Sequence, residues 1–398
     1  MKVLHLTFSD HYGGANIAGY RLHKCLETKI FSRLLVFDKN KSEKNIIQYF
    51  DKKIISIKIK NYLVKFLNIF CTNKFKHSYN LFNSGIVEYI NKLDVDIVHM
   101  HWINNELISI EEISKIKKKI IWTFHDMWPM CGTEHYTNSN RYITGYYSKN
   151  KDFFGLDFPK YIWNKKKKYF NNSINIVSPS LWLKKKISKS YIFKKRKVNL
   201  IRYAINTRLW KPNSKIIKHK SSIKLLFCAV NFISDSRKGF YPLIKTLNLL
   251  ATKCDFELCT IGDSIPKDLK VNFIIKELKH TNNEKKLVRY FNNCEALLLP
   301  STQDNFPNVG LEALCVGIPV ISSKSSGMHE VISNKKNGII LDSFNVKNLK
   351  KAIHWVKKNR TKKFMRQKIH ANIDKKVNYE TISKQMILLY SRILNGQN

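Results

Sequence analysis

Short apolar runs alternate with segments of helical period along the whole chain. Such runs predict strands of a buried parallel sheet, which is covered on both faces, and the amphipathic segments between them predict helices. The pattern therefore indicates an α/β fold. We expect strands at Val3–Phe8, Leu34–Phe37, Asp96–His101, Ile120–Phe124, Ile174–Ser178, Lys224–Val230, Phe256–Ile261, Ala296–Pro300 and Pro319–Ser322, and helices at Ala15–Leu26, Tyr241–Ala251, Glu284–Asn293 and Val309–Val316.

The strand pattern is interrupted once, by a polar and basic segment at Asn206–Ser222 that contains a proline. Such a segment favours a linker between two doubly wound domains. We place these domains at residues 1–210 and 211–375, and residues 376–398 read as a C-terminal helix.

The chain of 398 residues has 71 Lys and Arg against 29 Asp and Glu, a formal charge of +42. This excess calls for an anionic partner such as nucleic acid, a membrane surface or a phosphorylated substrate. A hydrophobic content of 43% excludes wholesale disorder. Three cation runs lie in the first half, at Lys165–Lys168, Lys184–Lys186 and Lys194–Lys197.

The eight cysteines are scattered and form no C-x-x-C pair, which argues against a zinc ribbon or a disulfide framework. The N-terminal apolar run stops at Ser9-Asp10, too early for a signal peptide, and no run of 18 apolar residues exists. We therefore expect reduced thiols and a cytoplasmic location.

Two glycine-containing loops follow predicted strands and precede helices. Gly13-Gly14 would let the backbone approach a ligand while the helix start offers N–H groups to an anion, although an ordinary tight turn has the same pattern. Arg237-Lys238 at the start of the second domain, just before Gly239, would suit a diphosphate, although single cations mean little in so basic a chain.

The segment Ser301–Glu312 gives the clearest indication of a binding site in the sequence. Asp304 lies in a predicted strand-to-helix loop, and Glu312 lies in the next helix within an otherwise apolar run. Two carboxylates facing one crevice can accept hydrogen bonds from sugar hydroxyls, and the N–H groups around Asn308–Gly310 can take an anion.

Histidines mark the first domain. His125-Asp126 ends a predicted strand, where active sites of parallel sheets lie. His99 and His101 share one face of another strand. A metal site is the alternative interpretation, but no H-E-x-x-H motif is present and the cysteines do not have the spacing of metal ligands.

These residues resemble the retaining GT-B glycosyltransferases of family four. The family carries two glutamates separated by seven residues, and here the pattern reads Asp304-x7-Glu312 within DNFPNVGLEALCVGIPVISSKSSGMHEVI. GGANIAGYRLHKCL and WTFHDMWPMCGTEHY are similar to first-domain blocks of colanic-acid transferases. The resemblance covers residues 2–390 and implies two Rossmann-like domains facing across a cleft, with the C-terminal helix returning to the first.

The resemblance also implies roles. Glu312 would bind the ribose, Asp304 the hydroxyls of the transferred sugar, and Arg237 and Lys238 the diphosphate, while His125 would lie beside the sugar. No metal would be needed, because the cations compensate the leaving-group charge. Further donor contacts would come from the glycine loop and the helix start, at Gly13, Gly14, Asn305, Phe306, Asn308, Val309 and Gly310.

Two positions differ from the family pattern. Asp304 is one methylene shorter than the usual Glu, and Cys131-Gly132-Thr133-Glu134 precedes His135 where a glycine and then a cysteine are expected. The implied reaction moves a sugar from a nucleoside diphosphate to a hydroxyl of a lipid-linked saccharide in bacterial surface polysaccharide biosynthesis. A sugar-nucleotide epimerase or hydrolase on the same fold, or a basic nucleic-acid-binding protein, stays open as an alternative.

Lys52–Phe70 predicts a basic amphipathic helix. Its apolar residues form one stripe, flanked by lysines, and consist of Ile55, Ile59, Tyr62, Phe66 and Ile69. Such a helix is typical of attachment to an anionic membrane, here the inner face of the cytoplasmic membrane. The alternative is that the stripe packs on the sheet of the first domain.

Overall fold

The computed structural model describes residues 1–49, 54–68, 76–148, 157–170, 174–213, 222–360 and 363–397. The chain divides into two compact units, unit 1 (Met1–Ala204 with Ile382–Asn398) and unit 2 (Ile205–Thr381). These boundaries lie a few residues from those placed on the sequence. Residues 214–221 of the predicted linker lie outside the described residues.

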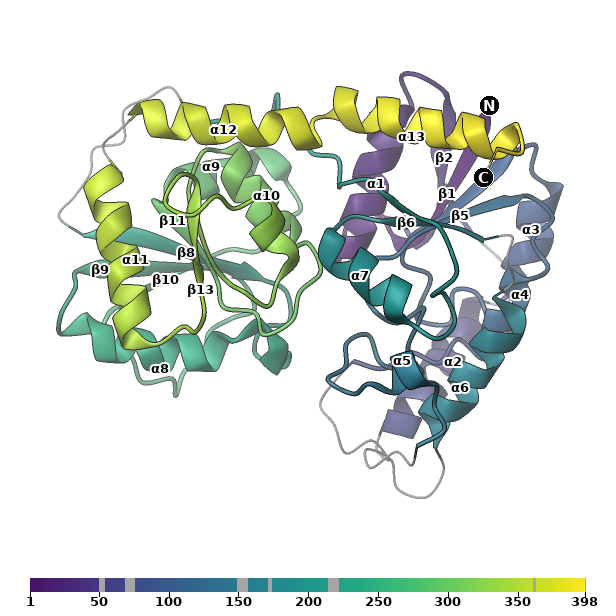
Figure 1. The fold of residues 1–398 in the computed structure, drawn as a ribbon, viewed down its shortest axis with the longest axis horizontal. Coiled ribbons are helices and arrows are strands. Elements are labelled where there is room, and N and C mark those ends of the chain that lie inside the picture. Colours follow the sequence, from purple (N-terminus) through teal and green to yellow (C-terminus); the bar gives the residue numbers. More distant parts are fainter. Residues whose placement is uncertain are drawn as a thin grey trace. The chain divides into compact units, whose positions relative to one another are not determined.

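Unit 1 is built on a seven-stranded parallel sheet with the order β3-β2-β1-β4-β5-β6-β7 (Figure 1). The order runs outward in both directions from the first strand, as in a doubly wound fold. The strands are β1 (Lys2–Ser9), β2 (Phe31–Asp38), β3 (Ile46–Gln48), β4 (Ile97–Met100), β5 (Lys119–Thr123), β6 (Ile174–Ser178) and β7 (Val198–Leu200).

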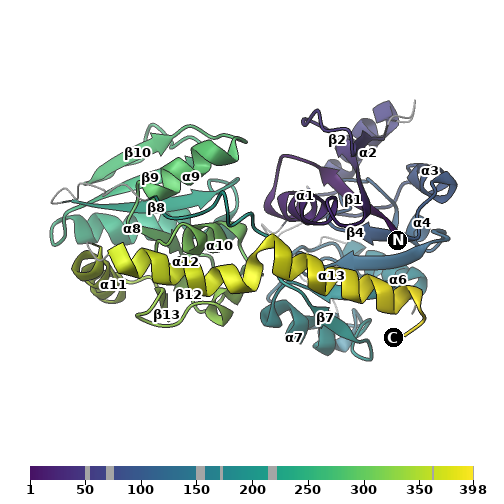
Figure 2. The same cartoon turned by 90° about the horizontal axis from the view of Figure 1, so that it is seen from above.

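Helices cover both faces of this sheet, and the C-terminal helix α13 (Tyr379–Leu394) lies along it together with α1 (Figure 2). Ile382 and the residues after it belong to unit 1, and the hydroxyl of Tyr390 lies 2.6 Å from Nδ1 of His99 on β4. The other helices are α1 (Gly14–Leu26), α2 (Ile54–Leu67), α3 (Ile86–Lys92), α4 (Ile110–Ile113), α5 (Arg141–Thr144), α6 (Phe158–Tyr169) and α7 (Leu181–Lys189).

Unit 2 contains a six-stranded parallel sheet with the order β10-β9-β8-β11-β12-β13. Its strands are β8 (Ile223–Ala229), β9 (Phe256–Gly262), β10 (Ile274–Leu278), β11 (Ala296–Leu299), β12 (Val320–Ser323) and β13 (Gly338–Leu341). Its elements also include the helices α8 (Phe240–Ala251), α9 (Glu284–Asn292), α10 (Asn308–Cys315), α11 (Val346–Asn359) and α12 (Lys363–Val377), and the 3-10 turns η2 (Ser236–Lys238) and η3 (Gly327–Glu330).

In unit 2, α8 and α11 pack on one face of the sheet and α9, α10 and α12 on the other (Figure 1). The central strand β11 is apolar and buried throughout, and β8 is apolar except for Lys224, with four of its seven residues buried. The carboxyl ends of these two neighbours therefore lie at one sheet edge, which is where ligands bind in doubly wound folds.

The predicted α/β fold with two doubly wound units is confirmed, as are the nine predicted strands and four predicted helices. Four strands were not predicted, and all four are sheet edges, namely β3, β7, β10 and β13. Each edge strand has partly exposed positions, so its sequence lacks a continuous apolar run.

No described helix combines the length and the hydropathy that crossing a bilayer requires. The cysteines that the structure describes are free thiols, and most of them are buried.

Candidate functional site

Three residues predicted to bind one ligand come together in unit 2. Lys238 ends the turn after β8, Asp304 lies in the loop after β11, and Nζ of Lys238 is 2.8 Å from Oδ2 of Asp304. Nη1 of Arg237 lies 3.8 Å from the same oxygen and donates to the carbonyl of Gln303 at 2.7 Å. The backbones are joined as well, because the N–H of Thr302 donates to the carbonyl of Arg237 at 2.9 Å.

The charge state of Asp304 follows from these neighbours. Its side chain is buried, with a residue exposure of 7%, and burial alone would raise the pKa of its carboxyl group. The positive charges of Lys238 and Arg237 outweigh burial and hold this pKa below its usual value. Where the loops after β8 and β11 meet, two cations therefore lie beside one ionised carboxylate.

Glu312, the other carboxylate predicted to bind the donor, is buried. It lies on α10 and is 6% exposed. The thiol of Cys228, near the end of β8, has a pKa raised by burial and then by the negative charge of Glu312, while the charge of Lys238 opposes the rise. The charges of Glu312 and Lys238 therefore both act on the thiol of Cys228.

The residues at the start of α10 are buried or half-buried. Asn305 and Phe306 are buried, and Asn308 and Val309 are half-buried in the first turn. The N–H of Gly310 donates to the carbonyl of Pro307 at 3.0 Å, and anion binding by the N–H groups around Asn308–Gly310 stays a prediction.

Close packing explains why position 310 is a glycine. A Cβ at this position would lie 2.7 Å from Cε of Met328, on the 3-10 turn η3. Glycine therefore lets α10 approach that turn closely, which fixes the helix on which Glu312 stands.

Gly239 fixes the neighbouring lysine. Its φ of 72° is left-handed, and a Cβ would lie 2.6 Å from the carbonyl oxygen of Pro300 at the end of β11. We expect Gly239→Ala to lower the melting temperature more than Gly396→Ala, because Gly396 has the same φ of 72° but nothing within 4 Å of its Cβ. Circular dichroism melts of the two variants measure the difference, and equal melting temperatures would show that the contact with Pro300 does not matter.

In unit 1, the glycine loop after β1 is held by one side chain. Gly13 has a φ of 86° and caps α1 without a side-chain hydrogen bond. Asn16 donates to the carbonyl of Tyr12 at 2.7 Å and accepts from Thr7 at 2.6 Å. Gly14 is the exposed first residue of α1, so the backbone at this helix start is reachable by a ligand.

His125 follows β5 and is 8% exposed. Its Nδ1 lies 2.8 Å from the hydroxyl of Tyr203, and its Nε2 lies 3.3 Å from Nδ1 of His101. Burial lowers the pKa of His125 to about 4, with a small opposing effect of Asp126. His125 is therefore a neutral imidazole at neutral pH, with both nitrogens engaged by protein groups.

Behind His125 the structure places a cluster of histidines. His101 and His99 stack at 4.5 Å, and His101 Nε2 lies 3.1 Å from Nδ1 of His5. His5 was missed by sequence reasoning. The register that pairs His5 with His99 depends on β1 lying beside β4, which the spacing of residues along the chain does not reveal.

Ligand atoms of His5, His99 and His101 lie within 4.8 Å of one another, close enough to hold a metal ion. Both nitrogens of His99 are used otherwise, since Nδ1 meets the Tyr390 hydroxyl and Nε2 lies 2.8 Å from Oγ1 of Thr123. The three rings also lie nearly parallel, 21–30° apart, rather than directing lone pairs at one point. The cluster therefore fits hydrogen bonding better than metal ligation.

The segment after Asp126 is held by two buried polar contacts. Asp126 Oδ2 lies 2.6 Å from Nδ1 of His135, whose Nε2 lies 2.8 Å from Oγ of Ser78. This is the order of a Ser–His–Asp triad, but Ser78 is 4% exposed and not open to a substrate.

The second contact involves Lys166, which lies in a cation run predicted to face a membrane. Its Nζ is fully buried and donates to the carbonyls of Trp128, Cys131 and Gly132 at 2.5, 3.1 and 2.6 Å. Burial lowers the pKa of this ammonium to about 7, against the raising effects of Cys131 and two carboxylates. Lys166 is therefore structural and does not belong to the surface charge.

The comparisons with known proteins point to one class. Unit 2 carries the match to the family model described as "Glycosyl transferases group 1", over residues 219–376. HepE from Anabaena, solved in complex with UDP, superposes with a TM-score of 0.64 at 13% identity, covering 98% of this chain and 100% of that one. The chain thus has the GT-B fold of two Rossmann-like units, and residues 219–376 are similar to the group 1 glycosyl transferases.

Two curated relatives come from bacterial surface polysaccharide systems. An N,N'-diacetylbacillosaminyl-diphospho-undecaprenol alpha-1,3-N-acetylgalactosaminyltransferase of Campylobacter jejuni is 25% identical over 160 residues, 40% of this chain. An uncharacterized 41.2 kDa protein in the cps region of Klebsiella pneumoniae is 23% identical and covers 65% of this chain and 68% of its own length. The chain spans 43% of the length of the Campylobacter relative.

Proposed function

We propose that the protein is a glycosyltransferase that moves a sugar from a nucleoside diphosphate to a saccharide in bacterial surface polysaccharide biosynthesis. The observation that carries the proposal is the cation pair of Arg237 and Lys238, held by Asp304 at the carboxyl ends of β8 and β11. This pair lies inside the part of the chain that matches the group 1 family.

The chemistry of these residues suits a diphosphate leaving group. Negative charge grows on the diphosphate in the transition state, and preorganised cations in a partly dry site stabilise it without a metal ion. Asp304 and Glu312 accept hydrogen bonds from donor hydroxyls. In unit 1, Gly14 at the start of α1 and the neutral His125 are the proposed donor contacts, and the anomeric configuration of the sugar is retained.

A lipid-linked acceptor is the finer part of the proposal. The Campylobacter relative is named for an undecaprenol diphosphate acceptor, and the Klebsiella relative lies in a capsule region. The donor sugar and the linkage are left to experiment.

Product analysis tests the reaction. With a sugar nucleotide and a saccharide acceptor, proton NMR should show a new glycosidic bond of the same anomeric configuration as the donor. An epimer or free sugar formed equally fast without acceptor would favour the epimerase or hydrolase. DNA binding without any sugar-nucleotide binding would favour the nucleic-acid alternative.

We also propose that α2 attaches the protein to the cytoplasmic membrane. Lys52, Lys53, Ile69 and Phe70 of the predicted helix lie outside the described residues. Four large apolar side chains of α2 are exposed at helical spacing, namely Ile59 (56%), Tyr62 (78%), Leu63 (56%) and Phe66 (59%). Val64 packs into the core instead, so α2 keeps one face on unit 1 and offers an apolar face outward.

Vesicle sedimentation tests this attachment. We expect wild-type protein to bind vesicles that contain phosphatidylglycerol and to dissociate from them at high salt. The double variant Tyr62→Ser, Phe66→Ser should bind at least about tenfold more weakly, because burying one large apolar side chain contributes roughly 1.5–3 kcal/mol to the free energy of binding. Phe364→Ser, which removes a 74% exposed aromatic from α12, is the matched control. Equal binding of the double variant and the control would contradict attachment through α2.

A further inference from the structure

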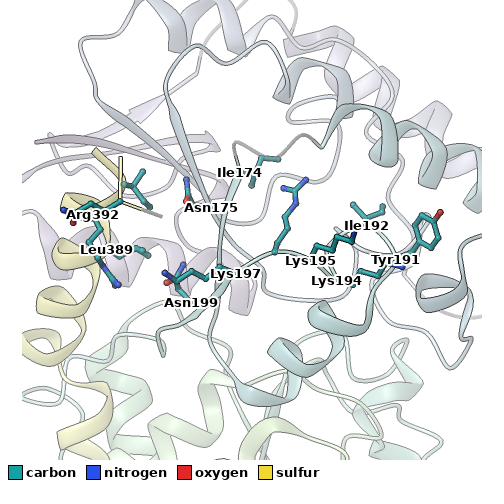
Figure 3. Close-up of a pocket in the computed structure, with 13 residues that line it drawn as sticks. Ile174, Asn175, Tyr191, Ile192, Lys194, Lys195, Lys197, Asn199, Leu389 and Arg392 are labelled. Carbon is teal, nitrogen blue, oxygen red and sulfur yellow. The ribbon is translucent and has the colours of Figure 1, made fainter. Parts of the chain in front are cut away.

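A cavity of about 430 Å³ opens in unit 1, where the cation run Lys194–Lys197 lines it and none of the candidate site residues does (Figure 3). Its walls come from the start of β6, from the segment Tyr191–Lys197 that leads into β7, and from the last turns of α13. A volume of this size lies within the range of about 300–1,000 Å³ that is typical of small-ligand sites.

The lining is strongly basic. Five cationic side chains line the cavity and no aspartate or glutamate does, the cations being Lys194, Lys195, Arg196, Lys197 and Arg392. Within the part of the chain that the structure describes, none of the five forms an ion pair. Concentrated charge of one sign in a concave site attracts an anion of the opposite sign.

Two guanidinium groups of the lining hold buried donors without acceptors. Nη1 of Arg196 and Nε of Arg392 are both buried and have no hydrogen-bond partner among the described residues. Nη2 of Arg196 donates to the carbonyl of Phe170 at 2.7 Å, so this side chain is fixed in place. A buried donor left unpaired costs free energy, and two of them beside one basic cavity indicate a missing acceptor.

The remaining lining is apolar or neutral. Leu389 and Ile393 of α13 line the cavity together with Ile174, Ile192 and Tyr191. A ligand that fills this site therefore combines an anionic group for the arginines with a less polar part for the α13 side.

We propose that this cavity is a binding site for a phosphate group carried by a small molecule or a lipid, in addition to the donor site of unit 2. The planar fork of arginine matches phosphate oxygens in pairs, and the lysines add point charges around it. The site consists of unit 1 residues alone, so it does not depend on the assigned glycosyltransferase function.

Calorimetric titration with inorganic pyrophosphate tests the site, in a Lys238→Ala background that removes the donor-site lysine. We expect Arg392→Gln in that background to weaken binding by at least about tenfold, the size of one lost charge-assisted hydrogen bond. Lys185→Gln is the matched control, since it removes an exposed cation of the neighbouring α7 that does not line the cavity. Lys197→Gln serves as a second lining variant, and melting curves show whether each variant is folded.

A second arm distinguishes the source of the phosphate. Vesicles of phosphatidylcholine with and without phosphatidic acid are sedimented with the same variants. Pyrophosphate binding that depends on Arg392 supports a soluble phosphate ligand, and binding of phosphatidic acid vesicles alone that depends on Arg392 supports a lipid headgroup. If folded Arg392→Gln and Lys197→Gln bind both probes as the control does, or if neither probe binds the parent, the proposal is overturned.

Discussion

Replacing Lys238 by alanine is expected to reduce turnover at least about tenfold and up to about a hundredfold, because a charge-assisted contact in the transition state contributes roughly 1.5–3 kcal/mol. The ammonium lies 2.8 Å from the carboxylate of Asp304. Its loss removes a cation from the leaving diphosphate and also leaves the buried Asp304 with less compensation. Glu312→Gln should show a loss of similar size through a different contact.

The control for this prediction is Lys245→Ala. It removes an exposed lysine from α8, the helix that begins two residues after Lys238. Steady-state kinetics of the three variants, beside their melting temperatures, separate a lost contact from a lost fold. Near-normal turnover in both Lys238→Ala and Glu312→Gln would remove the basis of the site in unit 2.

Unit 1 is expected to lose stability steeply as the pH falls from 7 to 5. Burial lowers the pKa of His99 to about 3 and those of His23 and His125 to about 4, and it places the pKa of His5 and His101 well below the usual value. In the unfolded chain the same groups titrate near pH 6.5. Below that pH the unfolded state therefore binds more protons than the folded state, and acid favours unfolding.

The slope should approach about 1.4 kcal/mol per pH unit for each histidine that stays neutral in the folded state. Urea unfolding followed by tryptophan fluorescence reports mainly on unit 1, which contains most of the tryptophans. His99→Gln should reduce the slope by about 1.4 kcal/mol per pH unit, which corresponds to one proton. His354→Gln, which changes an exposed histidine of unit 2, should not. A free energy of unfolding that is independent of pH over this range would show that the cluster is already protonated.

The central strands could be predicted from the sequence because burial on both faces leaves a readable apolar run, as in Ala296–Leu299. The edge strands could not, and β10 shows why. Its residues alternate between exposed and half-buried positions, so tertiary pairing with β9 decides the strand rather than local composition.

The site shows the same division. Position after a strand pointed to Lys238 and Asp304, and the structure joins these two residues because β8 and β11 are neighbours. Tyr203 could not be found in this way, since its hydroxyl reaches His125 across 78 positions of sequence. The close packing of Gly310 on Met328 could not be predicted either, because a glycine at a helix start suits both an anion and close packing.

The central claim is that unit 2 binds a nucleoside diphosphate sugar through the cations beside Asp304. Calorimetric titration with a panel of sugar nucleotides measures this directly, in wild-type protein, Lys238→Ala and Lys245→Ala. The account predicts that at least one sugar nucleotide binds the wild type, that Lys238→Ala weakens this binding at least about tenfold and that Lys245→Ala leaves it unchanged. Equal affinity in all three proteins, or no binding of any member of the panel to the wild type, would contradict it.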